Sequence, residues 1–212
     1  MLTAIVDYEA GNLHSAEKAF QRMAREADAG DVVVTDKADV VARADRIVLP
    51  GDGAFPACMA ELKGHKGIFE AMVEAVTERG RPFLGICVGM QLMASRGLEY
   101  QETDGLGWIA GEVDRIAPAQ PGLKVPHMGW NDLVLDSDHP VFDGISTGDH
   151  AYFVHSYQFR TQVADEMLAH VEYGGSVTAI VGRDTMIGTQ FHPEKSHATG
   201  LRMIANFLKW TP

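Results

Sequence analysis

Short apolar runs separated by stretches of helical periodicity make up the first half of the chain. Four of these runs are typical of buried strands: residues 3–7, 31–35, 46–50 and 82–86. The stretches between them predict a helix beginning near Asn12, a short polar helix before residue 46, a helical region that ends at Gly80, and a helix over 88–97. Alternating strands and helices predict a parallel sheet with helices on its faces.

From about Leu106 the pattern changes to short runs separated by turn residues. Six of these runs are typical of strands: 107–117, 124–135, 151–159, 166–174, 176–184 and 185–193. Gly174-Gly175 and Arg183-Asp184 predict hairpin turns between consecutive strands. A last helix over 197–210 has an apolar face at helical spacing.

Together these patterns predict an α/β fold with three layers. We expect a mostly parallel central sheet, helices on both of its faces, and added antiparallel strands in the C-terminal half. The 212 residues are enough for a full core, and we expect one domain over 1–212.

Charge and cysteine content narrow the class of protein. The 18 basic and 29 acidic side chains give a formal charge of −11, which disfavours nucleic acid or an anionic membrane as a partner. No apolar run approaches the roughly 18 residues that a membrane span needs, and the first residues lack the basic start of a signal peptide. Two cysteines, Cys58 and Cys87, do not make a disulfide framework, so we expect a cytoplasmic protein.

The candidate chemistry begins at Cys87, between a predicted strand and a predicted helix. Gly85-Ile86-Cys87-Val88-Gly89 has the form of a nucleophile elbow, in which small flanking residues permit a sharp strand-to-helix turn. A helix beginning there would favour the thiolate, and the Val88 N–H would be placed to donate to an oxyanion. The alternative is a buried cysteine that packs as a small hydrophobe.

His192 is the candidate base for such a thiol. It ends an apolar strand in "TQFHPEKSH", and Glu194 follows two positions later on the same side of an extended chain. The carboxylate would hold the ring and stabilise imidazolium. Cys87 and His192 are 105 residues apart, so only the fold can join them. A solvated turn, or a metal site that also uses His197, are the competing interpretations.

The segment "LPGDGAF" (49–55) is the third candidate element. Gly51 and Gly53 allow close approach of the backbone to a ligand, or a flip of a peptide plane. Next to Cys87, this loop would supply a second N–H for an oxyanion. It matches neither glycine-rich phosphate motif, so a phosphate site is disfavoured, and a plain turn remains possible.

The combination of "PGDGAF", "GICVGMQLM" and "FHPEKS", in this order and spacing, resembles the class I glutamine amidotransferases. The resemblance covers essentially the whole chain. Three further segments, "DYEAGNLHS", "VPHMGWN" and "YFVHSY", are similar to those members that serve as glutaminase subunits of imidazole glycerol phosphate synthases in histidine biosynthesis.

The resemblance implies that Cys87 attacks the side-chain amide of glutamine, that His192 moves the protons, and that Glu194 orients His192. It also implies an oxyanion hole supplied or framed by Gly53 and Val88. Neither a metal nor an organic cofactor is implied. The residues that it implies for holding the glutamine are Gln91 and the backbone of Ser156 and Tyr157.

The resemblance further implies a heterodimer with a (β/α)-barrel synthase subunit, which receives the ammonia away from bulk water. Our candidates for the docking face are Asn12, Trp130, Tyr152 and Lys195. Asp52 departs from the family, which usually has valine there. A carboxylate facing an oxyanion would be costly, so we expect Asp52 to point outward.

Other functions share parts of this pattern. A stand-alone cysteine hydrolase would have an elbow and a histidine, and a flavodoxin-like binding module would keep the sheet and use Cys87 for packing. Among amidotransferases, the pyridoxal-phosphate type normally carries Gly-Gly-Glu-Ser at the loop near Gly51, and the anthranilate type lacks the "DYEAGNLHS" opening.

Overall fold

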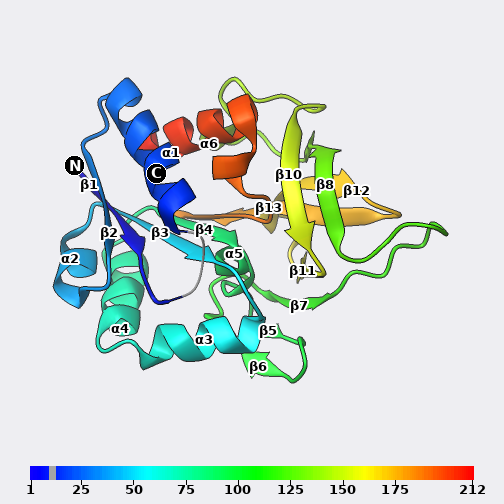
Figure 1. Cartoon of the computed structure of the whole chain (residues 1–212), viewed down its shortest axis with the longest axis horizontal. Helices are drawn as coiled ribbons and strands as arrows, with labels where there is room; N and C mark the ends of the chain where they lie inside the picture. Colours follow the sequence, from blue (N-terminus) through cyan, green and yellow to red (C-terminus); the bar gives the residue numbers. More distant parts are fainter. Residues whose placement is uncertain (10–12) are drawn as a thin grey trace.

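The computed structural model, which describes residues 1–9 and 13–212, is built around an eight-stranded sheet (Figure 1). The strands follow one another across the sheet in the order β2 (Asp31–Thr35), β1 (Leu2–Val6), β3 (Arg46–Gly51), β4 (Phe83–Cys87), β14 (Met186–Thr189), β13 (Ser176–Arg183), β12 (Met167–Glu172) and β9 (Val134–Leu135). Neighbours among the first five strands are parallel. The last three strands are joined antiparallel. The predicted mixture of parallel and antiparallel strands is confirmed.

Helices cover both faces of this sheet. The helices α1 (Leu13–Ala27) and α6 (His197–Lys209) pack together on one face. The opposite face carries α2 (Ala38–Arg43), α3 (Phe55–Gly64) and α4 (Ile68–Val73), which continues as a π-helical turn over Glu74–Glu78 (Figure 1). Helix α1 turns Phe20 and Met23 into the core at helical spacing. None of the helices in the described part is long and apolar enough to cross a membrane.

Two smaller sheets lie on the side of the molecule away from the N-terminus (Figure 1). One is a pair of antiparallel strands, β8 (His127–Asp132) and β10 (His150–His155). The other has the order β11 (Tyr157–Thr161), β7 (Gly111–Arg115), β5 (Arg96–Gly97) and β6 (Thr103–Asp104). The periodicity predicted most of these strands, but it did not predict that they leave the central sheet.

The helix predicted over 88–97 is wrong in length. Helix α5 spans only Val88–Gln91, and Arg96–Gly97 is already strand β5. The Ser95 N–H donates to the Gly111 carbonyl, which draws the chain into the smaller sheet. Gly97 packs so closely on the Phe55 ring that a Cβ there would lie 2.5 Å from it. Tertiary contacts therefore override the helical periodicity after the first turn.

The strand register brings distant parts of the chain to one edge of the sheet. Gly51 at the end of β3 pairs with Cys87 at the end of β4. Thr189 at the end of β14 pairs with Ile86, the residue before Cys87. Because the carboxyl ends of parallel strands meet at the same edge, this is where a ligand site is expected.

The crossing of α5 over β3 predicts a large effect of Gly89→Ala on folding. A Cβ at position 89 would lie 1.9 Å from the Leu49 carbonyl oxygen, and both atoms belong to the backbone. Since neither can move without disturbing the sheet, Gly89→Ala should lower the free energy of unfolding by about 3 kcal/mol or more, measured by urea denaturation.

Gly64→Ala is the matched control. Gly64 is the last residue of α3, and a Cβ there would meet nothing within 4 Å. The free energy of unfolding should stay within about 0.5 kcal/mol of the parent or rise slightly. Equal losses in the two variants would contradict the predicted close packing.

Candidate functional site

Cys87 lies on a tight turn that its neighbours permit. Its backbone has φ 55° and ψ −113°, a conformation that L-residues rarely adopt. A Cβ at position 85 would lie 2.5 Å from the Gly89 carbonyl oxygen, so glycine is required there as well as at position 89. The predicted reason for the flanking glycines is confirmed. With α5 only one turn long, however, the helix contributes little to stabilising a thiolate.

His192 and Glu194 lie just beyond β14, as predicted. The His192 Nδ1 donates to Glu194 Oε1 over 2.9 Å, and the two side chains are only 9% and 4% exposed. A 3₁₀ turn over Pro193–Lys195 places the His192 and Glu194 side chains on the same side of the chain. The Ser196 hydroxyl donates to the His192 carbonyl over 2.7 Å and fixes the backbone there.

Charge interactions couple Cys87 to His192. Burial alone would lower the pKa of His192, but the hydrogen bonds and charges of Cys87 and Glu194 outweigh burial and raise that pKa to about 10. The imidazole is therefore cationic at neutral pH when it faces a thiolate. The arrangement suits a sulfur that attacks a carbonyl carbon and an imidazole that moves a proton.

A hollow of about 270 Å³ opens beside the Cys87 sulfur. All five residues predicted for the oxyanion hole and the ligand line it: Gly53, Val88, Gln91, Ser156 and Tyr157. Asp52 also lines the hollow, and the residue is exposed. The structure thus gathers these residues around the thiol from three separate segments of the chain.

The Gln91 side chain is held in one orientation by its hydrogen bonds. Its Nε2 donates to the Tyr157 carbonyl over 3.2 Å and to Gln190 Oε1 over 3.0 Å. The Gln190 Nε2 in turn lies 3.8 Å from the Cys87 sulfur. The sequence interpretation missed Gln190, although a glutamine just after a buried strand and before an apolar residue is a usable signal.

Two buried histidines are the other residues that the sequence interpretation missed. His127 on β8 and His155 on β10 are 2% and 6% exposed, and His155 also lines the hollow. The predicted "VPHMGWN" and "YFVHSY" segments contain them, so a histidine inside each apolar strand was the available signal.

At the end of β3, a backbone carbonyl faces the Val88 N–H, which is one of the predicted oxyanion donors. Ile47 N–H donates to the Pro82 carbonyl, and bonds in a parallel ladder repeat every second residue. Because Gly51 pairs with Cys87 in the same register, this repeat turns the Gly51 carbonyl toward the Val88 N–H. The Tyr8 hydroxyl holds the Pro50 carbonyl over 2.8 Å, and the Cys58 thiol lies 3.8 Å from the Asp52 carbonyl oxygen.

Two of the predicted docking residues lie together on the surface. Trp130 is 47% exposed, and its ring lies 5.8 Å from that of Tyr152 on the neighbouring strand. On another side it stacks on His197 at 4.9 Å. Lys195 lies in the 3₁₀ turn that follows His192. Asn12 lies outside the residues that the structure describes.

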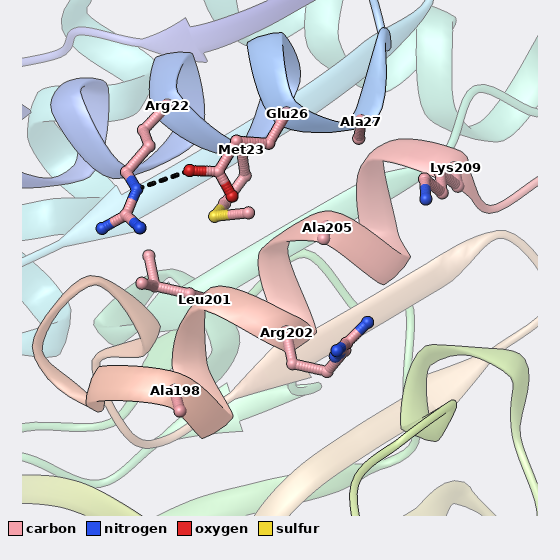
Figure 2. Close-up of a pocket in the computed structure, with 9 residues that line it drawn as sticks. All are labelled: Arg22, Met23, Glu26, Ala27, Ala198, Leu201, Arg202, Ala205 and Lys209. Carbon is pink, nitrogen blue, oxygen red and sulfur yellow. Dashed lines mark hydrogen bonds and ion pairs between the residues drawn. The ribbon is translucent and has the colours of Figure 1, made fainter.

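A second hollow of about 260 Å³ lies between α1 and α6 (Figure 2). Arg22, Arg202 and Lys209 reach its rim, and the Arg22 Nε is paired with Glu26 over 2.8 Å. Its lining holds neither a thiol nor a histidine. The hollow beside Cys87 is therefore the candidate site for chemistry.

The cation next to Cys87 predicts how that thiol reacts. An unassisted cysteine is only about 3% ionised at pH 7. With His192 protonated up to a pKa of about 10, Cys87 should be alkylated by iodoacetamide at pH 6–7. His192→Gln removes the cation and should slow alkylation at pH 7 about tenfold, with the rate recovering toward pH 9. Mass spectrometry of quenched samples measures both rates.

Cys58 provides the internal control for this labelling. It is 1% exposed, and burial raises the pKa of its thiol to about 12. Cys87→Ala should therefore leave the native chain unlabelled at pH 7. Equal alkylation rates of the parent and His192→Gln at pH 7 would show that the imidazole does not activate the sulfur.

Comparison with known proteins gives a consistent result along the whole chain. The family model "Glutamine amidotransferase class-I" matches residues 4–210. The chain is 74% identical over 212 residues to the imidazole glycerol phosphate synthase subunit HisH of Ruegeria pomeroyi, with all of both chains covered. It is 70% identical, again over the full length of both chains, to the protein of the same name from Cereibacter sphaeroides.

Solved structures show the same fold at lower sequence identity. A glutamine amidotransferase aligns with a TM-score of 0.72 and 20% identity over 97% of this chain and 98% of that one. The glutaminase domain of Trypanosoma brucei CTPS, solved with bound acivicin, aligns with a TM-score of 0.66 and 15% identity over 100% of this chain and 95% of that one. At these identities the likeness concerns the fold alone.

Proposed function

Because the chain belongs to the class-I glutamine amidotransferase family, we propose that it is the glutaminase subunit of an imidazole glycerol phosphate synthase. The observation that carries this proposal is the 74% identity, over the full length of both chains, to a relative with that name. The meeting of Cys87, His192 and Glu194 at one sheet edge supports it independently, because a packing cysteine would need no such neighbours.

In the proposed reaction the Cys87 sulfur attacks the side-chain amide carbon of glutamine. The C–N bond then breaks as His192 gives its proton to the departing nitrogen, which leaves as ammonia and produces a glutamyl thioester. His192, now neutral, takes a proton from water, and the water oxygen attacks the thioester. Glutamate leaves, and the sulfur and imidazole return to their first state. Glu194 keeps the His192 ring in place throughout.

The oxyanion that forms on the amide carbon needs backbone donors. Val88 N–H and the loop at Gly53 are our candidates, because both lie on the hollow beside the sulfur. The Gly51 carbonyl faces Val88 in this conformation, so a peptide of the Gly51–Gly53 loop must rotate before the hole is complete. Binding of a partner that favours the rotated state would switch the glutaminase on.

The partner that we propose is a (β/α)-barrel synthase subunit that takes up the ammonia. Ammonia is useful only while it remains unprotonated and away from bulk water, so the barrel must dock close to the thiol. Trp130, Tyr152 and Lys195 support this position. Lys195 lies in the turn after His192, the His192 N–H donates to the Tyr152 carbonyl, and the Trp130 ring lies 5.8 Å from that of Tyr152. Exposed aromatic residues of this kind are common anchors of protein interfaces.

Cys87→Ala tests whether the thiol is needed only when glutamine is the nitrogen source for synthesis. In the complex of this chain with the synthase subunit of the same organism, the variant should lose glutamine-dependent synthesis by about 1,000-fold or more. Synthesis from added ammonium salts should persist, because the barrel does not need the thiol to use free ammonia. The rate of product formation is measured with each nitrogen source. Loss of both activities would show that Cys87 is structural or that the partner is wrong.

Trp130→Ala tests the docking face. The isolated chain should hydrolyse glutamine slowly, and the synthase subunit with its nucleotide substrate should raise the rate. Removing the indole should weaken the complex about 30-fold, measured by titrating one subunit with the other. Tyr100→Ala is the control, because Tyr100 is an 86% exposed aromatic residue outside the predicted face. Full activity of the isolated chain, unchanged by the barrel subunit, would contradict the proposal.

A further inference from the structure

Behind the hollow beside Cys87, two buried histidines face each other across a pair of strands. His127 and His155 are directly opposite in the register of β8 and β10, which lie side by side in Figure 1. The His127 Nδ1 lies 2.9 Å from the His155 Nε2, which is hydrogen-bond distance for two rings inside the protein. Neither residue takes part in the thioester chemistry described above.

The partners of this pair fix where each proton lies. The His155 Nδ1 is 2.8 Å from the Tyr157 carbonyl, which can only accept, so this nitrogen carries the hydrogen. The His155 Nε2 must then accept from the His127 Nδ1. The remaining His127 nitrogen, Nε2, accepts from the Asn131 amide over 3.2 Å. Every ring nitrogen therefore has a partner, with both rings neutral.

Burial keeps the two rings uncharged. It lowers the pKa of His127 to about 4. It also lowers the pKa of His155 to about 3, although the Tyr157 carbonyl opposes that shift. At neutral pH each ring consequently offers one donor and one acceptor, in the order that the hydrogen bonds require. The pair is suited to holding a neighbour in place and unsuited to storing a proton.

The neighbour that the pair holds belongs to the wall of the hollow. The Tyr157 carbonyl accepts from His155 Nδ1 and also from Gln91 Nε2, so both of its lone pairs are used. The same Gln91 amide reaches Gln190, whose own amide points at the Cys87 sulfur. A shift of the Tyr157 carbonyl would thus remove one of the two hydrogen bonds that hold the Gln91 side chain in its orientation.

We propose that His155 is a positioning residue for glutamine binding, acting through its Nδ1–H on the Tyr157 carbonyl, with His127 selecting the required tautomer. This inference rests on the proposed glutaminase function. His155 does not act as a base toward the thiol, because one of its nitrogens is committed to His127 and the other to Tyr157. Its role is to keep the Gln91 wall of the hollow preorganised for glutamine.

Two substitutions of His155 distinguish the roles of its two ring nitrogens. The Asn amide nitrogen reaches about the position of Nδ1, whereas the Gln amide nitrogen reaches about that of Nε2. His155→Gln should raise the KM for glutamine in the complex about tenfold, the effect of losing one well-placed hydrogen bond. His155→Asn, which keeps the donor to Tyr157, should stay within about twofold of the parent. In both variants kcat should fall by no more than about threefold.

The alkylation of Cys87 by iodoacetamide gives a second readout. Since Cys87 and His192 are unchanged, both variants should label at the parent rate. His170→Asn is the control for removing a strand histidine, because His170 is hydrogen-bonded to Asp136 and does not line the hollow. Its KM should equal that of the parent. If His155→Gln does not fold, His127→Gln removes the donor to His155 and should raise KM about threefold.

Several results would overturn this inference. Equal KM values for His155→Asn and His155→Gln, or a loss of kcat and of Cys87 labelling together with the rise in KM, would make His155 a general packing residue. A parent complex without any glutamine hydrolysis would instead refute the proposed function, whatever the variants do. The two failures are therefore distinguishable.

Discussion

The close approach of two backbone segments fixes the position of the Cys87 sulfur. Gly89 passes so near the Leu49 carbonyl that no side chain fits between them, and this contact closes the turn that carries Cys87 at a positive φ. The peptide groups around Leu49 in β3 are held by the hydrogen bonds of the sheet, which are costly to break inside the protein. The strain at Cys87 is consequently maintained by the sheet as a whole.

Polar contacts around the sulfur determine the shape of the hollow beside it. Gln190, Gln91 and the Tyr157 carbonyl link the sulfur to the strands of the smaller sheets. Strand β10 is connected to His192 as well, since the His192 N–H donates to the Tyr152 carbonyl over 3.1 Å. A buried polar network is costly when some of its groups lack hydrogen-bond partners. A network whose groups are all paired therefore specifies a single arrangement of its side chains.

Local sequence patterns predicted the parts of the molecule that depend on short-range physics. The elbow glycines, the His192–Glu194 pair and the alternating strands of the first half follow from turn sterics and periodicity. The shortness of α5 could not be predicted, because Gly97 is drawn away by the Phe55 ring from another element. The His127–His155 pair was missed for the same reason, since only the β8–β10 register joins residues 28 positions apart.

The place of β14 in the sheet has a consequence for synthesis on the ribosome. This strand lies between β4 and β13 and is among the last to leave the exit tunnel. Until it arrives, β4 is an open edge that a neighbouring nascent chain can pair with. His192 follows β14 in the chain, so the Cys87 sulfur at the end of β4 gains its imidazole neighbour only after this last strand has been made.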